Sequence, residues 1–149
     1  MPAQPTPDAV GSLKRSLVEL SRVDCLGLLA SNNFGRLAVS GGGDAPLIRP
    51  VNYMFDERSQ SVVFRTASGS KLHYLLRATR ATFEIDGVDA ENRTGWSVIM
   101  AGATEEVMQP LEVARLERLG LHTWPAGERS HWIRIRAWSI SGRRIALPE

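Results

Sequence analysis

The stretch Ser61–His73, which reads SVVFRTASGSKLH, joins a strand pattern directly to the start of a helix. Val62–Phe64 are β-branched and aromatic residues typical of a buried strand, whereas the leucines that follow have helical spacing. A helix N-terminus offers unpaired N–H groups and about half a positive charge, which favour a bound anion. The Ser68 and Ser70 hydroxyls and the Lys71 ammonium at this turn therefore predict a phosphate-binding site. The alternative interpretation is a serine N-cap followed by an exposed lysine.

Further strand patterns lie on both sides of this unit. Hairpin-length connections separate them, so we expect antiparallel pairing. Six antiparallel strands in a chain of 149 residues are best closed into a barrel, which removes exposed edges. The predicted fold class is therefore mainly β with short helices, arranged as a six-stranded antiparallel β-barrel. The strand segments are 34–40, 46–56, 61–67, 81–89, 95–107 and 131–147, the last being a strand pair or one bent strand.

Short helices are predicted before and between these strands. Leucines at helical spacing predict a helix over 13–20, and Pro110 and Gly120 bracket another one. Residues 1–12 are rich in proline and polar side chains, which is typical of a flexible arm. The domain prediction is an N-terminal arm over 1–12 and a single domain over 13–149.

Composition narrows the class of protein. The 18 basic and 16 acidic residues leave a net charge of +2, and the basic residues are scattered, which does not favour nucleic acid as a partner. The single cysteine, Cys25, excludes a disulfide within the chain, and the three histidines show no metal-ligand spacing. There is no signal-peptide pattern and no apolar run near the ~20 residues that span a bilayer, so we expect a cytoplasmic protein without a membrane partner.

Three other segments carry distinctive chemistry. The proline in IRPVNYMF, residues 48–55, indicates an irregular strand with backbone groups free for a flat polar ligand. In GWSVIMAG, Gly102 leaves room for another backbone or a ring. In residues 131–145, tryptophans and arginines alternate with isoleucines, which predicts an outward face suited to a protein interface or to single-stranded nucleic acid. Glu84 and Asp86 share a strand face, and we interpret them as solvated carboxylates or partners of an arginine rather than a catalytic pair.

The order of these segments resembles a known family. The segments GRLAV, PLIRPVNYMFD, VVFRTASGSKL, ATFEID, GWSVIMAGATEEV and SISGRRI follow one another as in the flavin-binding split-barrel proteins related to pyridoxamine 5'-phosphate oxidase. Within that group the chain is most similar to short bacterial proteins classed with nitroimidazole reductases. The resemblance extends from Cys25 to Ile145.

The resemblance implies a homodimer with two FMN molecules at the subunit interface. It assigns the FMN phosphate to Arg65, Thr66, Ser70 and Lys71. The isoalloxazine ring is expected on the strand formed by Arg49, Pro50, Val51 and Asn52. Polar contact is expected from Trp96 or Ser97, and Trp138, Arg143 and Arg144 are expected to approach the flavin from the second subunit.

The predicted function is an FMN-dependent reductase of small, planar, electron-poor molecules, with NAD(P)H as the donor. Because a flavin carries the redox chemistry itself, no catalytic side chain is predicted. The sequence has GRRI where true pyridoxamine 5'-phosphate oxidases have an Arg-Leu-His motif, which does not favour pyridoxine-phosphate oxidation. One alternative is a deazaflavin coenzyme in a wider basic groove formed by Arg134, Arg136, Arg143 and Arg144. The other is a non-enzymatic binding protein with a decayed flavin site.

Overall fold

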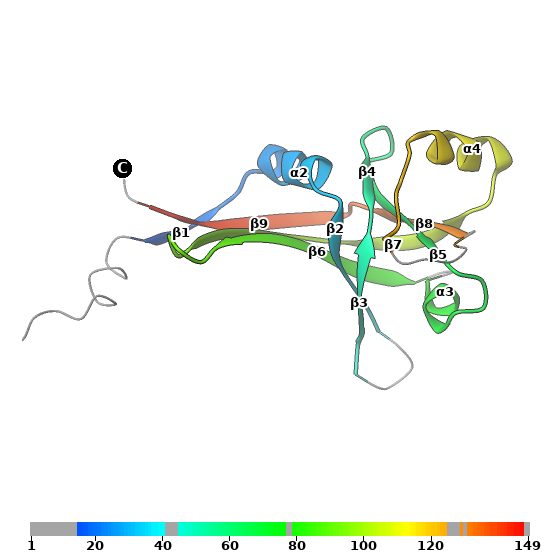
Figure 1. Ribbon diagram of the computed structural model, residues 1–149, viewed down its shortest axis with the longest axis horizontal. Coiled ribbons are helices and arrows are strands. Elements are labelled where there is room, and N and C mark those ends of the chain that lie inside the picture. The colour runs from blue at the N-terminus through cyan, green and yellow to red at the C-terminus, as the bar shows by residue number, and fades with distance from the viewer. Residues whose placement is uncertain (1–14, 41–44, 77–78, 125–128, 130, 148–149) are drawn as a thin grey trace, which may run out of the picture.

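The computed structural model describes residues 15–40, 45–76, 79–124, 129 and 131–147, without the side chains of Lys71 and Leu75. The predicted arm over 1–12 therefore lies outside the described residues. The described strands join one nine-stranded antiparallel sheet that is strongly curled (Figure 1). They are β1 (Ser16–Glu19), β2 (Phe34–Val39), β3 (Leu47–Asn52), β4 (Met54–Asp56), β5 (Ser61–Thr66), β6 (Arg80–Asp89), β7 (Thr94–Val107), β8 (His131–Arg136) and β9 (Ser139–Ala146).

The strand order explains the curl. The main path runs β3-β2-β6-β7-β8-β5-β4, and β9 pairs with both β7 and β1. Only Tyr53 separates β3 from β4, so the two ends of the path lie in one continuous segment. That segment pairs with β2 through its first half and with β5 through its second half. The result is a mainly β fold consistent with a split barrel.

The long strand β7 connects the two halves of the sheet. On one side it pairs with β6 from Thr94 to Ala103; on the other it pairs first with β9 and then with β8. The change of partner occurs at Gly102, where an added Cβ would lie 1.7 Å from the carbonyl oxygen of Arg136. The prediction that another backbone approaches Gly102 is therefore confirmed.

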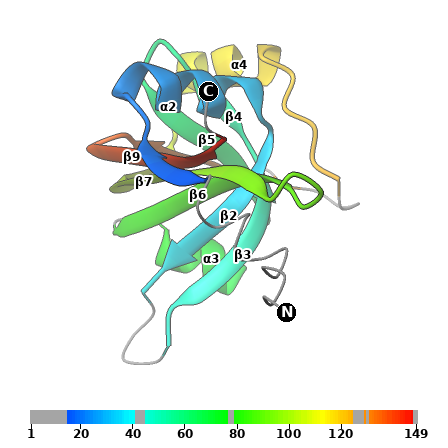
Figure 2. The same ribbon diagram turned by 90° about the vertical axis from the view of Figure 1, so that its left-hand side faces the viewer.

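The helices of the described residues cover the sheet, with α2 and α4 on one side and α3 on the other (Figures 1 and 2). They are α2 (Arg22–Ser31), α3 (Lys71–Leu75) and α4 (Pro110–Arg118). Helix α2 buries Cys25 and Leu29, and the Tyr53 hydroxyl donates a 2.7 Å hydrogen bond to the carbonyl of Leu29. This bond attaches α2 to the residue between β3 and β4. Among the described helices, none is long and apolar enough to cross a bilayer.

Two features differ from the sequence prediction. The predicted helix over 13–20 is wrong in its described part, residues 15–20, because Ser16–Glu19 forms β1 and pairs with β9, with Leu17 opposite Ile145. The leucine spacing there is compatible with a helix, but the partner strand lies at the other end of the chain and cannot be read locally. The strand count is nine rather than six because β1 is added, Tyr53 divides one predicted strand and residues 137–138 divide another.

Candidate functional site

A cavity of about 470 Å³ opens where β3, β5 and the start of α3 meet the segment around Trp124. Its volume lies within the ~300–1,000 Å³ usual for small-molecule pockets. The structure brings together here the segment predicted to carry a planar ring and most of the segment predicted to carry a phosphate. The predicted residues that line it are Arg49, Pro50, Val51, Asn52, Arg65, Thr66 and Ser70.

The irregular strand around Pro50 forms one wall of this cavity. Proline is tolerated there because β3 is an end strand of the path, paired only with β2, where Pro50 lies opposite Arg36. Asn52 ends β3 opposite Phe34, and Met54 then pairs with Val63 of β5. The strand segment that forms this wall therefore leaves β2 after Asn52 and pairs with β5 from Met54.

The turn after β5 is built as the sequence indicates. Gly69 has a φ of +73°, which glycine adopts without steric cost. Ser70 caps α3: its hydroxyl accepts a 3.0 Å hydrogen bond from the His73 N–H and donates one of 3.1 Å to the carbonyl of Ala67. The serine N-cap is confirmed, while the exposed lysine of the same interpretation stays a prediction. One lone pair of the Ser70 oxygen remains for a ligand.

Lys71 occupies the first position of α3, but its side chain lies outside the described residues. The predicted contact between its ammonium group and a phosphate therefore stays a prediction.

Three buried polar atoms on the cavity-lining residues have no hydrogen-bond partner among the described residues. They are Asn52 Nδ2, Arg65 Nε and the Thr66 hydroxyl oxygen. Each can donate a hydrogen bond, and leaving such a group buried and unpaired costs about 1–3 kcal/mol. A ligand rich in acceptor oxygens would satisfy such donors. The donor set therefore fits an anionic or carbonyl-bearing ligand.

An aromatic pair that the sequence analysis did not single out as a site also lines the cavity. The rings of Phe34 and Trp124 stack with centroids 5.0 Å apart and an interplanar angle of 8°. The Trp124 backbone N–H donates a 2.9 Å hydrogen bond to Asn52 Oδ1, which fixes this segment against β3. Trp124 is nevertheless 67% exposed, so its ring offers a face to a planar ligand. The sequence shows a single tryptophan at position 124, but no local pattern indicates that its ring stacks on Phe34 of β2.

A second group of predicted residues lies away from this cavity, on paired positions of β7 and β9. Trp96 lies opposite Arg144, and Ser97 opposite Arg143. All four line a separate groove of about 520 Å³. Within one chain they do not meet the residues of the first cavity, so any contact with the same ligand requires a second subunit.

Trp138 occupies a third place. The Arg80 guanidinium carbon lies over its ring, 5.5 Å from the ring centroid. Trp138 also borders another cavity, of about 450 Å³. It is 60% exposed. The sequence-predicted residues are therefore distributed over three surfaces of one chain.

The predicted outward face of tryptophans and arginines is wrong for Trp132 and Arg134 of β8, whereas Arg136 is exposed as predicted. Trp132 is buried, and Arg134 is only 6% exposed because α4 covers this face. Arg134 donates a 2.5 Å hydrogen bond to Glu112, and Arg136 donates one of 3.0 Å to Glu105. These two arginines are already paired with carboxylates, so they do not provide the open basic groove expected for a deazaflavin or for nucleic acid.

Glu84 and Asp86 are partners of an arginine, as one of the two favoured interpretations predicted. Arg36 donates a 2.6 Å hydrogen bond to Asp86 and lies 3.8 Å from Glu84. Burial and the neighbouring Asp86 raise the pKa of Glu84 despite this arginine. Neither carboxylate lines the cavity that contains Pro50 and Thr66, and Asp86 borders the separate groove beside Trp96 and Arg143.

Comparison with known proteins agrees with this architecture. Rv0080, an uncharacterised protein of Mycobacterium tuberculosis, is 35% identical over 136 residues, which cover 88% of this chain and 87% of the relative. The structure of an FAD-binding protein from Mycobacterium smegmatis superposes with a TM-score of 0.72 at 33% identity, covering 85% of this chain and 97% of that one.

A more distant structure, a candidate 5-nitroimidazole antibiotic resistance protein from Bacteroides thetaiotaomicron, shares the fold alone. Its sequence is 9% identical to this chain and its TM-score is 0.66, and the matched region covers 89% of this chain and 90% of that one. The family model described as pyridoxamine 5'-phosphate oxidase matches residues 21–144. With this match over most of its length and the mycobacterial relatives at about one-third identity, the chain belongs to the pyridoxamine 5'-phosphate oxidase family.

Proposed function

We propose that this protein binds a flavin in the cavity between β3, β5 and the Trp124 segment and acts as a flavin-dependent reductase. The observation that carries the proposal is the set of unpaired donors on Asn52, Arg65 and Thr66 beside an exposed aromatic ring. A flavin combines a flat ring that bears carbonyl oxygens with an anionic phosphate. It would therefore satisfy both the aromatic surface and the donors.

The residues divide between the two ends of such a ligand. Asn52 and the backbone of Arg49–Val51 would hold the ring, while Arg65, Thr66 and Ser70, with Lys71, would hold the phosphate. When bound, the flavin supplies hydride or electron transfer itself. The protein's own tasks are to orient the ring, to neutralise the phosphate charge and to leave one ring face open for a planar, electron-poor substrate.

The proposed flavin is FMN, with FAD as the second candidate because the M. smegmatis relative is an FAD-binding protein. A deazaflavin coenzyme has weaker support, since Arg134 and Arg136 are paired with carboxylates. A protein whose site has lost its cofactor is the remaining alternative, and absence of binding would favour it.

The proposal includes a homodimer built on the outer face of the sheet. Leu17 lies opposite Ile145, Ile145 opposite Gly95 and Gly95 opposite Val88, which makes an apolar row across β1, β9, β7 and β6. Leu17 is 63% exposed and Val88 79% exposed. An apolar row of this kind is typical of a protein–protein contact. It borders the groove that contains Arg143 and Arg144, the residues expected to reach a flavin in the second subunit.

Binding is tested by titrating the flavin-free protein with FMN, FAD and a deazaflavin while following flavin fluorescence. One flavin should bind per chain, and Thr66→Val and Arg65→Ala should each weaken it at least tenfold, by about 1.5–3 kcal/mol for a charged partner. Arg58→Ala, an exposed turn position, is the matched control. Equal affinity in Thr66→Val, Arg65→Ala and the parent would refute this placement.

The dimer is tested by light scattering on Val88→Glu, with Val23→Glu as the control because Val23 is equally exposed on α2. Val88→Glu should shift the protein to a monomer and weaken flavin binding. Activity is tested by following NADH and NADPH oxidation with a nitroimidazole as acceptor. A flavin-loaded dimer that oxidises neither nucleotide would exclude this donor and favour a binding role.

A further inference from the structure

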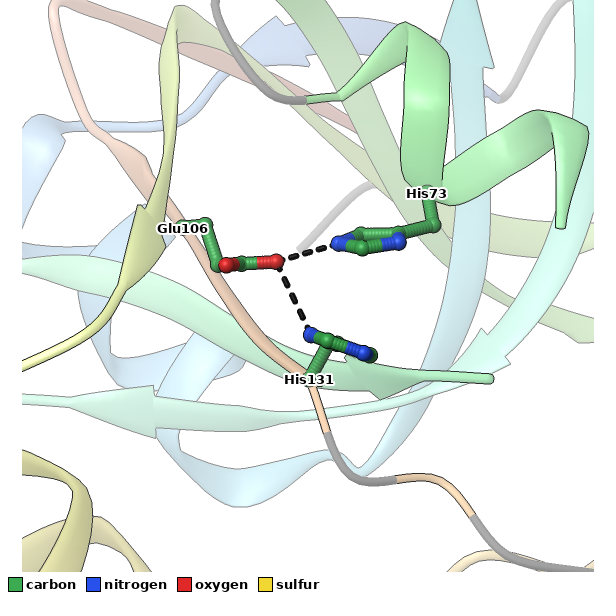
Figure 3. Close-up of side chains that lie close together, drawn as sticks. All are labelled: His73, Glu106 and His131. Atoms are coloured by element: carbon green, nitrogen blue, oxygen red, sulfur yellow. Dashed lines mark hydrogen bonds and ion pairs between the residues drawn. The ribbon is translucent and has the colours of Figure 1, made fainter. Parts of the chain in front are cut away.

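Three potential metal ligands from separate elements meet beside α3. His73 from α3, Glu106 from β7 and His131 from the start of β8 place Nε2, a carboxylate oxygen and Nδ1 within 4.8 Å of one another (Figure 3). Both imidazoles contact the same oxygen, Glu106 Oε1, with His131 Nδ1 at 3.0 Å. The side chains are 14%, 12% and 27% exposed for His73, Glu106 and His131, so all three are largely shielded from solvent.

The donor set and its spacing suit a first-row divalent cation. Imidazole nitrogens with a carboxylate oxygen are common ligands of Zn²⁺, with bonds of about 2.0–2.2 Å. In a tetrahedral site such bonds separate the ligand atoms by roughly 3.4 Å. Both imidazole nitrogens lie closer than this to Glu106 Oε1, His131 Nδ1 at 3.0 Å, so a bound cation would replace these direct contacts and move the side chains apart.

The Ser68 hydroxyl contacts the His131 ring and can fix its orientation for cation binding. The Ser68 oxygen lies 2.6 Å from His131 Nε2, on the opposite edge of the ring from Glu106. If Nδ1 binds a cation, it must be unprotonated, so Nε2 carries the hydrogen and donates it to Ser68. Metal-binding histidines usually have such an outer partner, which fixes the ring and its tautomer.

We propose that His73, Glu106 and His131 bind one divalent transition cation of the Zn²⁺ class, with Ser68 positioning His131. Three protein ligands leave a fourth position for water or a small anion. The cation would clamp α3 to β7 and β8. Because Thr66 lies opposite His131 in the sheet and Ser70 caps α3, the cation would hold the turn that forms one wall of the flavin cavity.

The same side chains can also stabilise the fold without a cation, as a carboxylate that accepts hydrogen bonds from two imidazoles. The two interpretations differ in what they predict for cation binding. The test is therefore made on flavin-free full-length protein after chelator treatment, so that its result does not depend on the proposed flavin function.

Isothermal titration with ZnCl₂ should show one site per chain. His73→Ala and His131→Ala should each lower the affinity at least 100-fold, and Ser68→Ala should lower it about 10–100-fold. His122→Ala, at an exposed histidine, is the matched control and should bind like the parent. No stoichiometric binding by the parent, or unchanged binding by His73→Ala and His131→Ala, would overturn the proposal.

If the histidine variants do not fold, zinc-edge X-ray absorption on the parent provides a second test. Nitrogen and oxygen scatterers with two imidazole rings are expected. A sulfur ligand would place the cation at Cys25, the only cysteine, and would refute the site.

Discussion

Asp56 provides a quantitative test of how α4 is attached to the sheet. Its carboxylate is buried and accepts hydrogen bonds from two Arg115 nitrogens, at 3.1 and 2.7 Å, and from the Ser59 hydroxyl at 2.6 Å. The Arg115 hydrogen bonds outweigh burial and, with Ser59 and the charges of Arg115 and Arg134, lower its pKa from 3.8 to about 2. A lowered pKa means that the folded protein favours the ionised carboxylate.

The size of this effect follows from the difference in pKa. At ~1.4 kcal/mol per pKa unit, the ionised Asp56 contributes about 2 kcal/mol to the free energy of unfolding. Since the folded pKa lies below the unfolded one, the contribution is fully present above about pH 5 and is lost as the pH falls toward 2. Asp56→Asn mimics the protonated carboxyl, so it should remove a similar amount at pH 7.

The assay is urea denaturation of the parent and Asp56→Asn at pH 7, 5, 3 and 2. Between pH 5 and 2 the parent should lose about 2 kcal/mol more than the variant. Glu57→Gln, at an exposed neighbouring position, is the control and should follow the parent. Equal acid sensitivity in the parent and Asp56→Asn would refute the attachment through Arg115.

Glu112 shares both arginines with Asp56, and Arg115 together with Arg134 outweighs burial and lowers its pKa to about 2. Because the two carboxylates have common partners, the effects of Asp56→Asn and Glu112→Gln should not add.

Three further substitutions test the fold and the cavity. Gly102→Ala should destabilise the protein by about 1–3 kcal/mol or more in urea denaturation, because the added Cβ meets the Arg136 carbonyl where β7 changes partner. Gly27→Ala is the control and should not destabilise the protein, because there is open space around its Cβ. Tyr53→Phe should lower the free energy of unfolding by about 1–3 kcal/mol, because the buried Leu29 carbonyl loses its hydrogen bond. Thermal and urea unfolding measure this loss, and an unchanged stability would show that water replaces the hydroxyl. Trp124→Ala should weaken flavin binding by about 0.5–1.5 kcal/mol through loss of stacking while leaving stability nearly unchanged, and Trp124→Phe should restore most of the affinity.

Local patterns in the sequence predicted much of the framework. Alternating apolar residues identified the segments of β2 to β9, and the turn residues before Lys71 identified the cap of α3. The family resemblance placed the segments around Pro50 and Thr66 in one site, and they do line one cavity. These features could be predicted because strand alternation and helix capping depend on residues close together in the chain.

The tertiary structure alone decided what lies against each face. Residues 131–136 alternate as expected, but alternation cannot show that α4 covers the arginine face and pairs Arg134 with Glu112. Likewise, His73 and Glu106 are 33 residues apart, and neither has a local ligand pattern. Strand β1 and the Phe34–Trp124 pair also depend on distant partners. Spacing along a chain defines the faces of an element, whereas the packing of distant elements determines which side chains meet.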